Sequence, residues 1–271
     1  MIDYKFTPKT NLTDAINELY KIIHLLRSVD GCPFDRVQTK EKSLASLLDE
    51  AYEYLDEVNK KDIAGQREEI GDVVWNSFFL ISMSEENNEF TATEVINEIC
   101  NKMVSRHEHV FGNKKADNPE EVLTLWGKYK ETKEGHKTDF NDFFKKIPTS
   151  LPPLETSYEI QKKIKKTGLE FSDVNSIIDK IQEELYEVKD AINSNDKDNT
   201  EMEIGDLLFA TVNLARFLGY RPNFALNRCN EKIKNRFQTV INLAQERNIE
   251  LTADNAEVID TLWEEAKKLH K

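Results

Sequence analysis

Cysteine and long apolar runs are scarce in this chain of 271 residues, and its 37 basic residues are outnumbered by 50 acidic ones. Its three cysteines form no CxxC pair, so the sequence predicts neither disulfides nor a cysteine zinc site and fits a reducing, cytoplasmic environment. No stretch approaches the roughly 18 apolar residues of a membrane-spanning helix, and residues 1–11 do not have the form of a signal peptide. The net charge of −13 disfavours nucleic acid as a partner, because phosphate backbones bind to basic surfaces.

Signatures of several catalytic classes are missing as well. The chain has no P-loop and no GxGxxG turn, the motifs in which glycine-rich loops bind phosphates. None of its five histidines stands three residues after a glutamate, which excludes the Glu-x-x-His motif of di-iron bundles. No His-Asp dipeptide occurs, so phosphohydrolases built on that dipeptide are excluded. Metal chemistry in this chain would therefore depend on carboxylates.

Helical periodicity dominates the sequence. Apolar residues step by three and four through residues 44–58 and 177–192, and the alternation typical of strands is not evident. We therefore expect an all-α protein. Helices are expected in the first half at 12–28, 41–60, 64–86, 92–110 and 119–133, and in the second half at 154–167, 173–193, 199–218, 223–247 and 255–270.

The length of the chain suits two domains of roughly 100–150 residues each. Between the halves, Pro148, Pro152 and Pro153 interrupt the helical pattern. The expected organisation is an N-terminal domain at 1–134, a linker at 135–153 and a C-terminal domain at 154–271.

The two halves share an acidic pattern. The tetrapeptide Glu-Ile-Gly-Asp stands at residues 69–72 and again at 203–206. At the same distance upstream of each copy lies a second acidic cluster, Asp-Glu-x-x-Glu at 49–53 and Glu-Glu-x-x-Glu at 183–187. Glycine–aromatic and Lys-x-x-x-Arg landmarks repeat in the same order. A repeat that spans nearly all of each half predicts two copies of one helical domain.

Each acidic cluster is suited to binding a metal ion. Residues three or four apart share a helix face, and an antiparallel hairpin would bring the two clusters of each half together. Several carboxylates so close repel one another, and a divalent cation removes that repulsion. Oxygen ligands favour Mg²⁺, with Mn²⁺ as a substitute. The candidate ligands are Glu184, Glu187, Glu203 and Asp206 in the second half, and Glu50, Glu53, Glu69 and Asp72 in the first.

The surroundings of these residues favour a metal site over a solvated acidic face, which is the alternative for any single glutamate. Residues 73–83 and 207–218, directly after the tetrapeptides, are apolar on most sides and are expected to form central, buried helices. An unpartnered carboxylate beside them would be costly. Gly71 and Gly205 each cost about 1 kcal/mol relative to alanine in a helix. Their recurrence indicates a close backbone approach or space for a ligand.

Basic and aromatic residues complete a candidate substrate site. Lys232 and Arg236 share a helix face, and Lys180 stands one turn before Glu184. A metal ion together with lysine and arginine suits a polyphosphate, to which arginine makes bidentate contacts. Phe171 or Trp263 could stack on a base, although core packing is the simpler role for either.

At this point the sequence resembles a known family. The pattern EExxE, a gap of about fifteen residues and then ExxD is similar to that of the all-α nucleoside triphosphate pyrophosphohydrolases, and its tandem form resembles MazG. The segments GCPFD at 31–35, RHEHVF at 106–111 and EIGDLLFATVNLAR at 203–216 resemble motifs of that family. The resemblance covers almost the whole chain. It implies Mg²⁺-dependent hydrolysis of a nucleoside triphosphate to a monophosphate and pyrophosphate, an obligate homodimer, and clearance of aberrant or excess nucleotides.

Roles carried over by position from the resemblance are assigned to the second half. They imply Mg²⁺ binding by Glu184, Glu187, Glu203 and Asp206, and phosphate binding by Lys232 and Arg236. Further candidate substrate contacts are Lys180, Asn213 and Phe171, and Glu183 is the candidate general base. The metal would polarise the phosphates and lower the pKa of a water, whose proton a carboxylate would accept.

Departures from the family pattern make the second half the better candidate for catalysis. The residues Asp49, Ser46 and Phe79 of the first half stand where the second half has Glu183, Lys180 and Asn213. In the second half, phenylalanine at position 171 replaces the family's tryptophan, and Asn199 stands where a basic residue is expected.

Two alternatives remain open. One is an enzyme of the same superfamily with a narrower substrate, such as dUTP. The other is a non-catalytic helical interaction protein in which the metal serves only for structure. The pair Lys232 and Arg236 argues against the second alternative, because a structural metal site does not need it.

Overall fold

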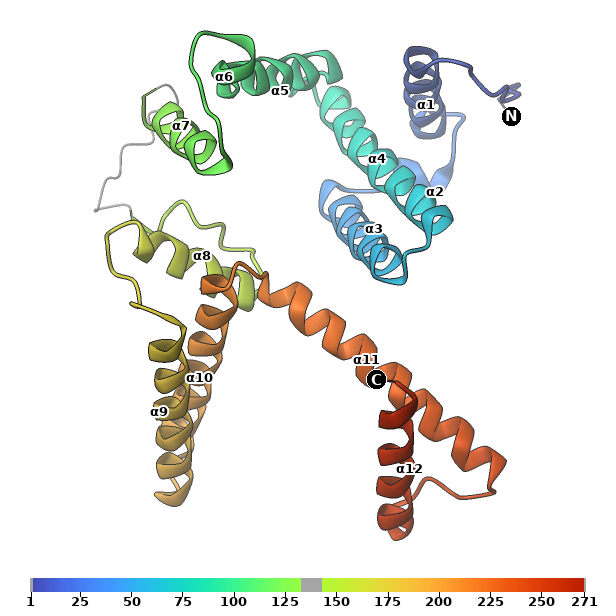
Figure 1. Ribbon diagram of the computed structural model, residues 1–271. Helices are drawn as coiled ribbons and strands as arrows, with labels where there is room; N and C mark the ends of the chain where they lie inside the picture. Colours follow the sequence, from blue (N-terminus) through green and yellow to red (C-terminus); the bar gives the residue numbers. More distant parts are fainter. Residues whose placement is uncertain (1, 133–142, 271) are drawn as a thin grey trace. The chain divides into compact units, whose positions relative to one another are not determined.

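The computed structural model describes residues 2–132 and 143–270, and its regular elements within these ranges are helices (Figure 1). The all-α prediction is therefore confirmed. The chain divides into two compact units, Met1–Lys137 and Thr138–Lys271. The expected linker at 135–153 begins inside 133–142, a segment that lies outside the described residues. None of the helices in the described ranges is both long enough and apolar enough to cross a membrane.

The first unit follows the expected helices with two differences. Its helices are α1 (Leu12–Arg27), α2 (Pro33–Arg36), α3 (Lys40–Lys60), α4 (Ile63–Glu86), α5 (Ala92–Arg106), α6 (Glu108–Phe111) and α7 (Pro119–Thr132). The short α2 was not expected. The single helix expected at 92–110 is wrong, because His107 leaves the helical conformation at φ −105° and ψ 45° and separates α5 from α6. The ring of His107 packs edge-on against Trp126 of α7, a contact that the local sequence does not reveal.

The second unit also follows the expected pattern. Its helices are α8 (Pro153–Lys165), α9 (Val174–Asn193), α10 (Lys197–Phe217), α11 (Pro222–Glu246) and α12 (Ala256–Leu269), with a 3₁₀ turn at Ala253–Asn255. The apolar side chains of Val240, Ala244, Leu262 and Ala266 pack α11 against α12.

One helical hairpin dominates each unit, and both hairpins turn in the same way. The α3–α4 turn contains Lys61 in the left-handed conformation, with φ 60°, and the α9–α10 turn contains Asn195 with φ 56°. In each turn the next residue is an aspartate whose side chain caps the following helix: Asp62 accepts from Ala64 N, and Asp196 accepts from Asn199 N. Such a cap contributes about 1 kcal/mol. Figure 1 shows α9 and α10 lying side by side and antiparallel, joined by this short turn.

The expectation that residues 73–83 and 207–218 form buried helices is only partly correct. In α4 the buried residues are Asn76, Phe79, Ser82, Met83 and Ser84, and in α10 they are Ala210, Val212 and Arg216. Val74 is 40% exposed and Leu208 is 54% exposed. A hairpin partner covers one face of a helix, so helices that are apolar on most sides keep an open apolar face within a single unit.

Candidate metal centre and adjoining cavity

Carboxylates of the second hairpin meet because they stand at equal distances from its turn. Glu187 and Glu203 are each eight residues from Asn195, and Glu184 and Asp206 are each eleven residues from it. Antiparallel helices both rise about 1.5 Å per residue, so equal counts bring residues to the same height. The hairpin therefore brings carboxylates that are far apart in the sequence into one group.

The first hairpin repeats the same counts around Lys61. Glu53 and Glu69 are each eight residues from Lys61, and Glu50 and Asp72 are each eleven residues from it. The two hairpins thus place their carboxylates by the same rule, as the repeat in the sequence predicts.

Each half brings three of its four candidate ligands into one group. Carboxylate oxygens lie within 4.8 Å of one another in Glu184, Glu187 and Glu203 of the second half, and in Glu50, Glu69 and Asp72 of the first. Asp206 and Glu53 stand at the same heights of their hairpins but outside these groups. The predicted approach of the two acidic clusters is thereby observed in both halves.

A lysine sets the charge balance of the second group. Lys180 Nζ lies 2.8 Å from a carboxylate oxygen of Glu183 and 2.8 Å from one of Glu184. Its hydrogen bond lowers the pKa of the buried Glu184 carboxyl. Glu187 behaves in the opposite way, because a hydrogen bond with Glu184, burial and repulsion from Glu184 and Glu203 raise its pKa. Glu183, the candidate general base, has a side chain that is 58% exposed.

The first group has no lysine at the matching position, which Ser46 occupies. Burial, together with repulsion from Asp72, Glu53 and Glu69, raises the pKa of Glu50. Burial and the neighbouring carboxylates also raise the pKa of Glu69. Both groups consist of carboxylate oxygens that repel one another, and this is a donor set that fits a hard divalent cation.

Lys232 and Arg236 are not brought to the carboxylates within the second unit. Both lie on α11, which leaves the end of α10 and diverges from the α9–α10 hairpin (Figure 1). Arg236 Nη2 instead donates to the backbone oxygen of His270 at 3.0 Å. Their role as phosphate ligands stays a prediction.

A cavity of about 320 Å³ opens beside the C-terminal part of α10. Its lining residues are Gln161, Ile164, Leu169, Glu170, Phe171, Phe209, Asn213 and Arg216. This volume lies at the lower end of the range of small-molecule sites, and such sites are largely apolar with a few fixed polar groups. Two residues predicted to contact substrate, Phe171 and Asn213, therefore line one cavity.

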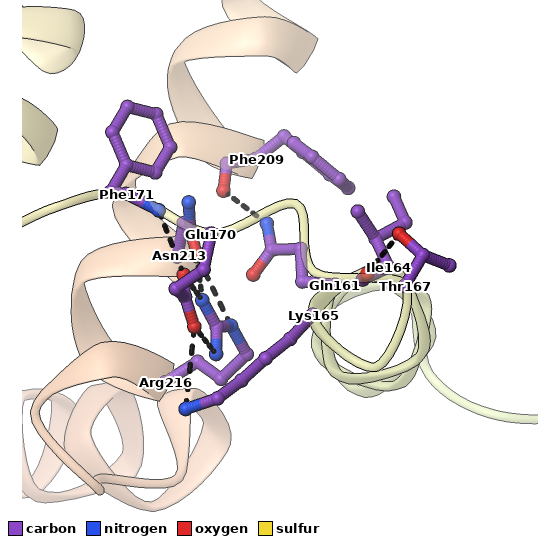
Figure 2. A network of polar contacts seen from close by, with 9 residues as sticks. All are labelled: Gln161, Ile164, Lys165, Thr167, Glu170, Phe171, Phe209, Asn213 and Arg216. Atoms are coloured by element: carbon purple, nitrogen blue, oxygen red, sulfur yellow. Dashed lines mark hydrogen bonds and ion pairs between the residues drawn. The ribbon is translucent and has the colours of Figure 1, made fainter.

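An ion-pair network forms one wall of the cavity (Figure 2). The Arg216 guanidinium donates to both oxygens of Glu170, at 3.0 Å and 2.6 Å, and to Asn213 Oδ1 at 2.7 Å and 3.1 Å. These hydrogen bonds with Arg216 hold the pKa of the Glu170 carboxyl below its ordinary value. Sequence reasoning did not assign Gln161, Glu170 or Arg216, although the buried arginine within the apolar end of α10 was a signal for a paired carboxylate.

Gly71 and Gly205 have open space around them. A Cβ atom built on either glycine would meet nothing within 4 Å. The expectation of a close backbone approach at these glycines is therefore wrong within each unit. The alternative expectation, space beside the aspartates, agrees with the structure.

Comparison with known proteins shows which family contains both carboxylate groups. A family model for the MazG nucleotide pyrophosphohydrolase domain matches the chain twice, at residues 38–111 and 172–241. The chain belongs to the MazG family. Both matched segments contain one of the carboxylate groups, and these groups are the residues that could hold the metal on which MazG enzymes depend. The resemblance found in the sequence is thereby confirmed, and the chain is a hydrolase of phosphoric anhydride bonds.

Similar proteins extend the MazG match to nearly the whole chain. A protein of Escherichia coli (strain K12) named nucleoside triphosphate pyrophosphohydrolase is 34% identical over 94% of this chain and 98% of its own length. A nucleoside triphosphate pyrophosphohydrolase/pyrophosphatase MazG of Thermotoga maritima is 34% identical over 92% of this chain and 94% of its own length. The uncharacterized protein YabN of Bacillus subtilis is 34% identical over 92% of this chain but only 51% of its own length.

Proposed function

We propose that the second half of the chain hydrolyses nucleoside triphosphates to nucleoside monophosphates and pyrophosphate, and thereby clears aberrant or excess nucleotides in the cytoplasm. The observation that carries this proposal is the group of Glu184, Glu187 and Glu203, with oxygens within 4.8 Å and Lys180 beside it. The names of the relatives from E. coli and T. maritima support the same reaction.

The metal that we propose is Mg²⁺, with Mn²⁺ as a substitute, because the available donors are carboxylate oxygens. Glu184, Glu187 and Glu203 would hold it, and Asp206, which lies on α10 at the height of Glu184 on α9, would add an oxygen. When bound, such an ion neutralises phosphate charge and lowers the pKa of a coordinated water. We also propose that Glu50, Glu53, Glu69 and Asp72 of the first half bind metal.

Protein groups beside the metal ligands have separate tasks in this proposal. Lys180 stays protonated, because hydrogen bonds with Glu183 and Glu184 raise its pKa, and it offers a cation to a phosphate oxygen. Glu183 is the proposed proton acceptor, since it lies at the edge of the group with an exposed side chain. Lys232 and Arg236 would bind the phosphates from α11 of a second copy of the chain, since α11 of the same chain diverges from the hairpin.

We further propose that the chain forms a homodimer through its hairpins. Large apolar side chains are exposed along α9 and α10, namely Ile178, Leu185, Ile192, Ile204 and Leu208. Burying each one stabilises an interface by about 1.5–3 kcal/mol at most. Light scattering at micromolar concentration should give the mass of two chains, and Leu208→Asp should reduce it to that of one. A monomeric wild type would contradict the dimer.

The reaction is tested by identifying its products. The protein is incubated with ATP, GTP, CTP, UTP and dUTP in the presence of Mg²⁺, and pyrophosphate and orthophosphate are measured separately. We expect pyrophosphate from several of these triphosphates and none after chelation of the metal. Orthophosphate as the sole product would overturn the proposal. Turnover of dUTP alone would favour the narrower enzyme, and metal binding without any turnover would favour the structural role of the metal.

A further inference from the structure

The guanidinium of Arg236, a proposed phosphate ligand on α11, is held by the residue that follows α12. Arg236 Nη2 donates to the backbone oxygen of His270 at 3.0 Å. The side chain of His270 is anchored on α11 in turn, because its Nε2 lies 2.7 Å from Thr239 Oγ1. Thr239 stands one turn after Arg236, so His270 contacts neighbouring positions on one face of α11. The three residues therefore form a closed chain of contacts between the two helices.

The packing of α11 against α12 brings these residues together. A buried cluster joins the two helices and consists of Val240, Ala244, Leu262 and Ala266. Arg236 stands one turn before Val240 on α11, and His270 stands one turn after Ala266 on α12. Figure 1 shows the end of α12 close to the middle of α11. Arg236 and His270 are thus the next positions along the two helices beyond the buried cluster.

One donor of the Arg236 guanidinium is left without a partner. Its Nε is buried and has no hydrogen-bond partner among the residues that the structure describes. Buried polar atoms in proteins nearly always have a partner, and an unpaired one is costly. A guanidinium that is fixed at one nitrogen and unsatisfied at another is suited to an oxyanion, which bonds to arginine through two nitrogens. The unpaired Nε therefore supports an anion at Arg236.

We infer that His270 and Thr239 are positioning residues, which hold the Arg236 guanidinium in the orientation that binds a phosphate group of the substrate. The inference rests on the proposed function, in which Arg236 is a phosphate ligand. Neither positioning residue needs to touch the substrate. An arginine side chain has many rotamers, and an acceptor that restricts them before the substrate arrives reduces the entropy that is lost on binding.

The kind of acceptor is suited to this role. Arg216, in the same unit, bonds to both oxygens of the Glu170 carboxylate, which neutralises its charge. The acceptor for Arg236 is a backbone oxygen of His270, which carries no net charge. It directs the guanidinium without neutralising it, and the positive charge stays available for a phosphate group.

The test measures KM and kcat for ATP in the full-length protein with Mg²⁺. Thr239→Val keeps the shape of the side chain and removes the oxygen that His270 contacts. We expect KM to rise about fivefold, with kcat close to the wild-type value, because a phosphate contact made in both the ground state and the transition state changes binding alone. His270→Ala should have the same effect. His270→Gln keeps a donor and an acceptor at the end of the side chain and should restore much of the wild-type KM.

A second threonine provides a matched control. Thr239 and Thr261 each donate to the backbone oxygen four residues earlier on their own helix, at 3.2 Å and 3.0 Å. Thr261→Val removes the same local bond on α12 and should leave KM unchanged. The decisive comparison repeats Thr239→Val in an Arg236→Ala protein. There it should have no further effect on KM, because it acts through the arginine.

An unchanged KM in a Thr239→Val protein that circular dichroism shows to be folded would overturn the inference. The same rise in KM with and without Arg236 would also overturn it, because the threonine would then act through the packing of the two helices. An unchanged KM in Arg236→Ala would remove the ligand that is to be positioned. In each of these cases the wild type still releases pyrophosphate, whereas failure of the proposed function would mean that it releases none.

Discussion

The α3–α4 and α9–α10 hairpins have the same turn and place their carboxylates by the same residue counts, but their surroundings differ. In the second hairpin Lys180 bonds to the carboxylates, whereas the first hairpin has Ser46 at that position. Asn213 lines a cavity, whereas Phe79 is part of the core. The carboxylate group therefore depends on the hairpin, and the features suited to a substrate depend on a few residues around it.

This difference indicates a division of labour within the chain. A group of carboxylates is sufficient for binding a cation, and both halves have one. A triphosphate carries several negative charges and a base, and it therefore needs cations and a cavity in addition. The second half has Lys180 beside its carboxylates and a cavity beside α10, so we expect the first half to serve in metal binding or assembly.

Removing one proposed metal ligand from each half gives the largest expected contrast. Glu187→Gln should lower kcat at least 100-fold, because metal-assisted steps depend on several kcal/mol of charge stabilisation. Glu53→Gln, the matched change in the first half, should leave most of the turnover. Steady-state rates are measured for both variants, with the dimer content checked alongside. Equal losses would mean that both halves are catalytic, and a larger loss from Glu53→Gln would reverse the assignment.

Alanine substitutions at the matched positions Phe79 and Asn213 compare the two halves by their effect on the free energy of unfolding. Phe79→Ala should lower the free energy of unfolding by about 3–4 kcal/mol, because it opens a void in the core. Asn213→Ala should cost only about 1 kcal/mol, because it removes hydrogen bonds beside an existing cavity. Urea denaturation followed by circular dichroism measures both. A cost for Asn213→Ala as large as that for Phe79→Ala would show that the cavity is closed in solution.

The ion pair behind Asn213 should make the stability of the second unit dependent on pH. The Glu170 pKa is lowered in the folded state, so its ionised form stabilises the fold at neutral pH, and this contribution is lost as the pH falls through the folded pKa. Glu170→Gln should lower the free energy of unfolding by about 1–2 kcal/mol at pH 7. The difference in this free energy between the variant and the wild type should shrink below about pH 4. Urea denaturation at several pH values measures the difference. A difference that does not change with pH would rule out the ionised pair as its source.

Much of the carboxylate group was predictable from the sequence, because it depends on local geometry. The spacing of Glu184, Glu187 and Glu203 on two helices with a short turn determines which side chains meet. The same reasoning gave the duplicated all-α organisation. It failed at His107, where a contact with Trp126 of another helix accompanies the end of α5. It also overestimated the burial of residues 73–83 and 207–218, because periodicity shows that a face is apolar but does not show what covers it.

The sequence by itself determined most of the helices, the repeat and the carboxylate pairs, since each follows from residues a few positions apart on one helix or across one turn. Only the tertiary structure decided that Arg216 pairs with Glu170, 46 residues away, and that Gln161 bonds to the backbone of Phe209, 48 residues away. It also decided that Phe79 fills the space that Asn213 leaves open. These contacts join elements through packing, and a linear pattern has no period that records which distant side chains share one cavity.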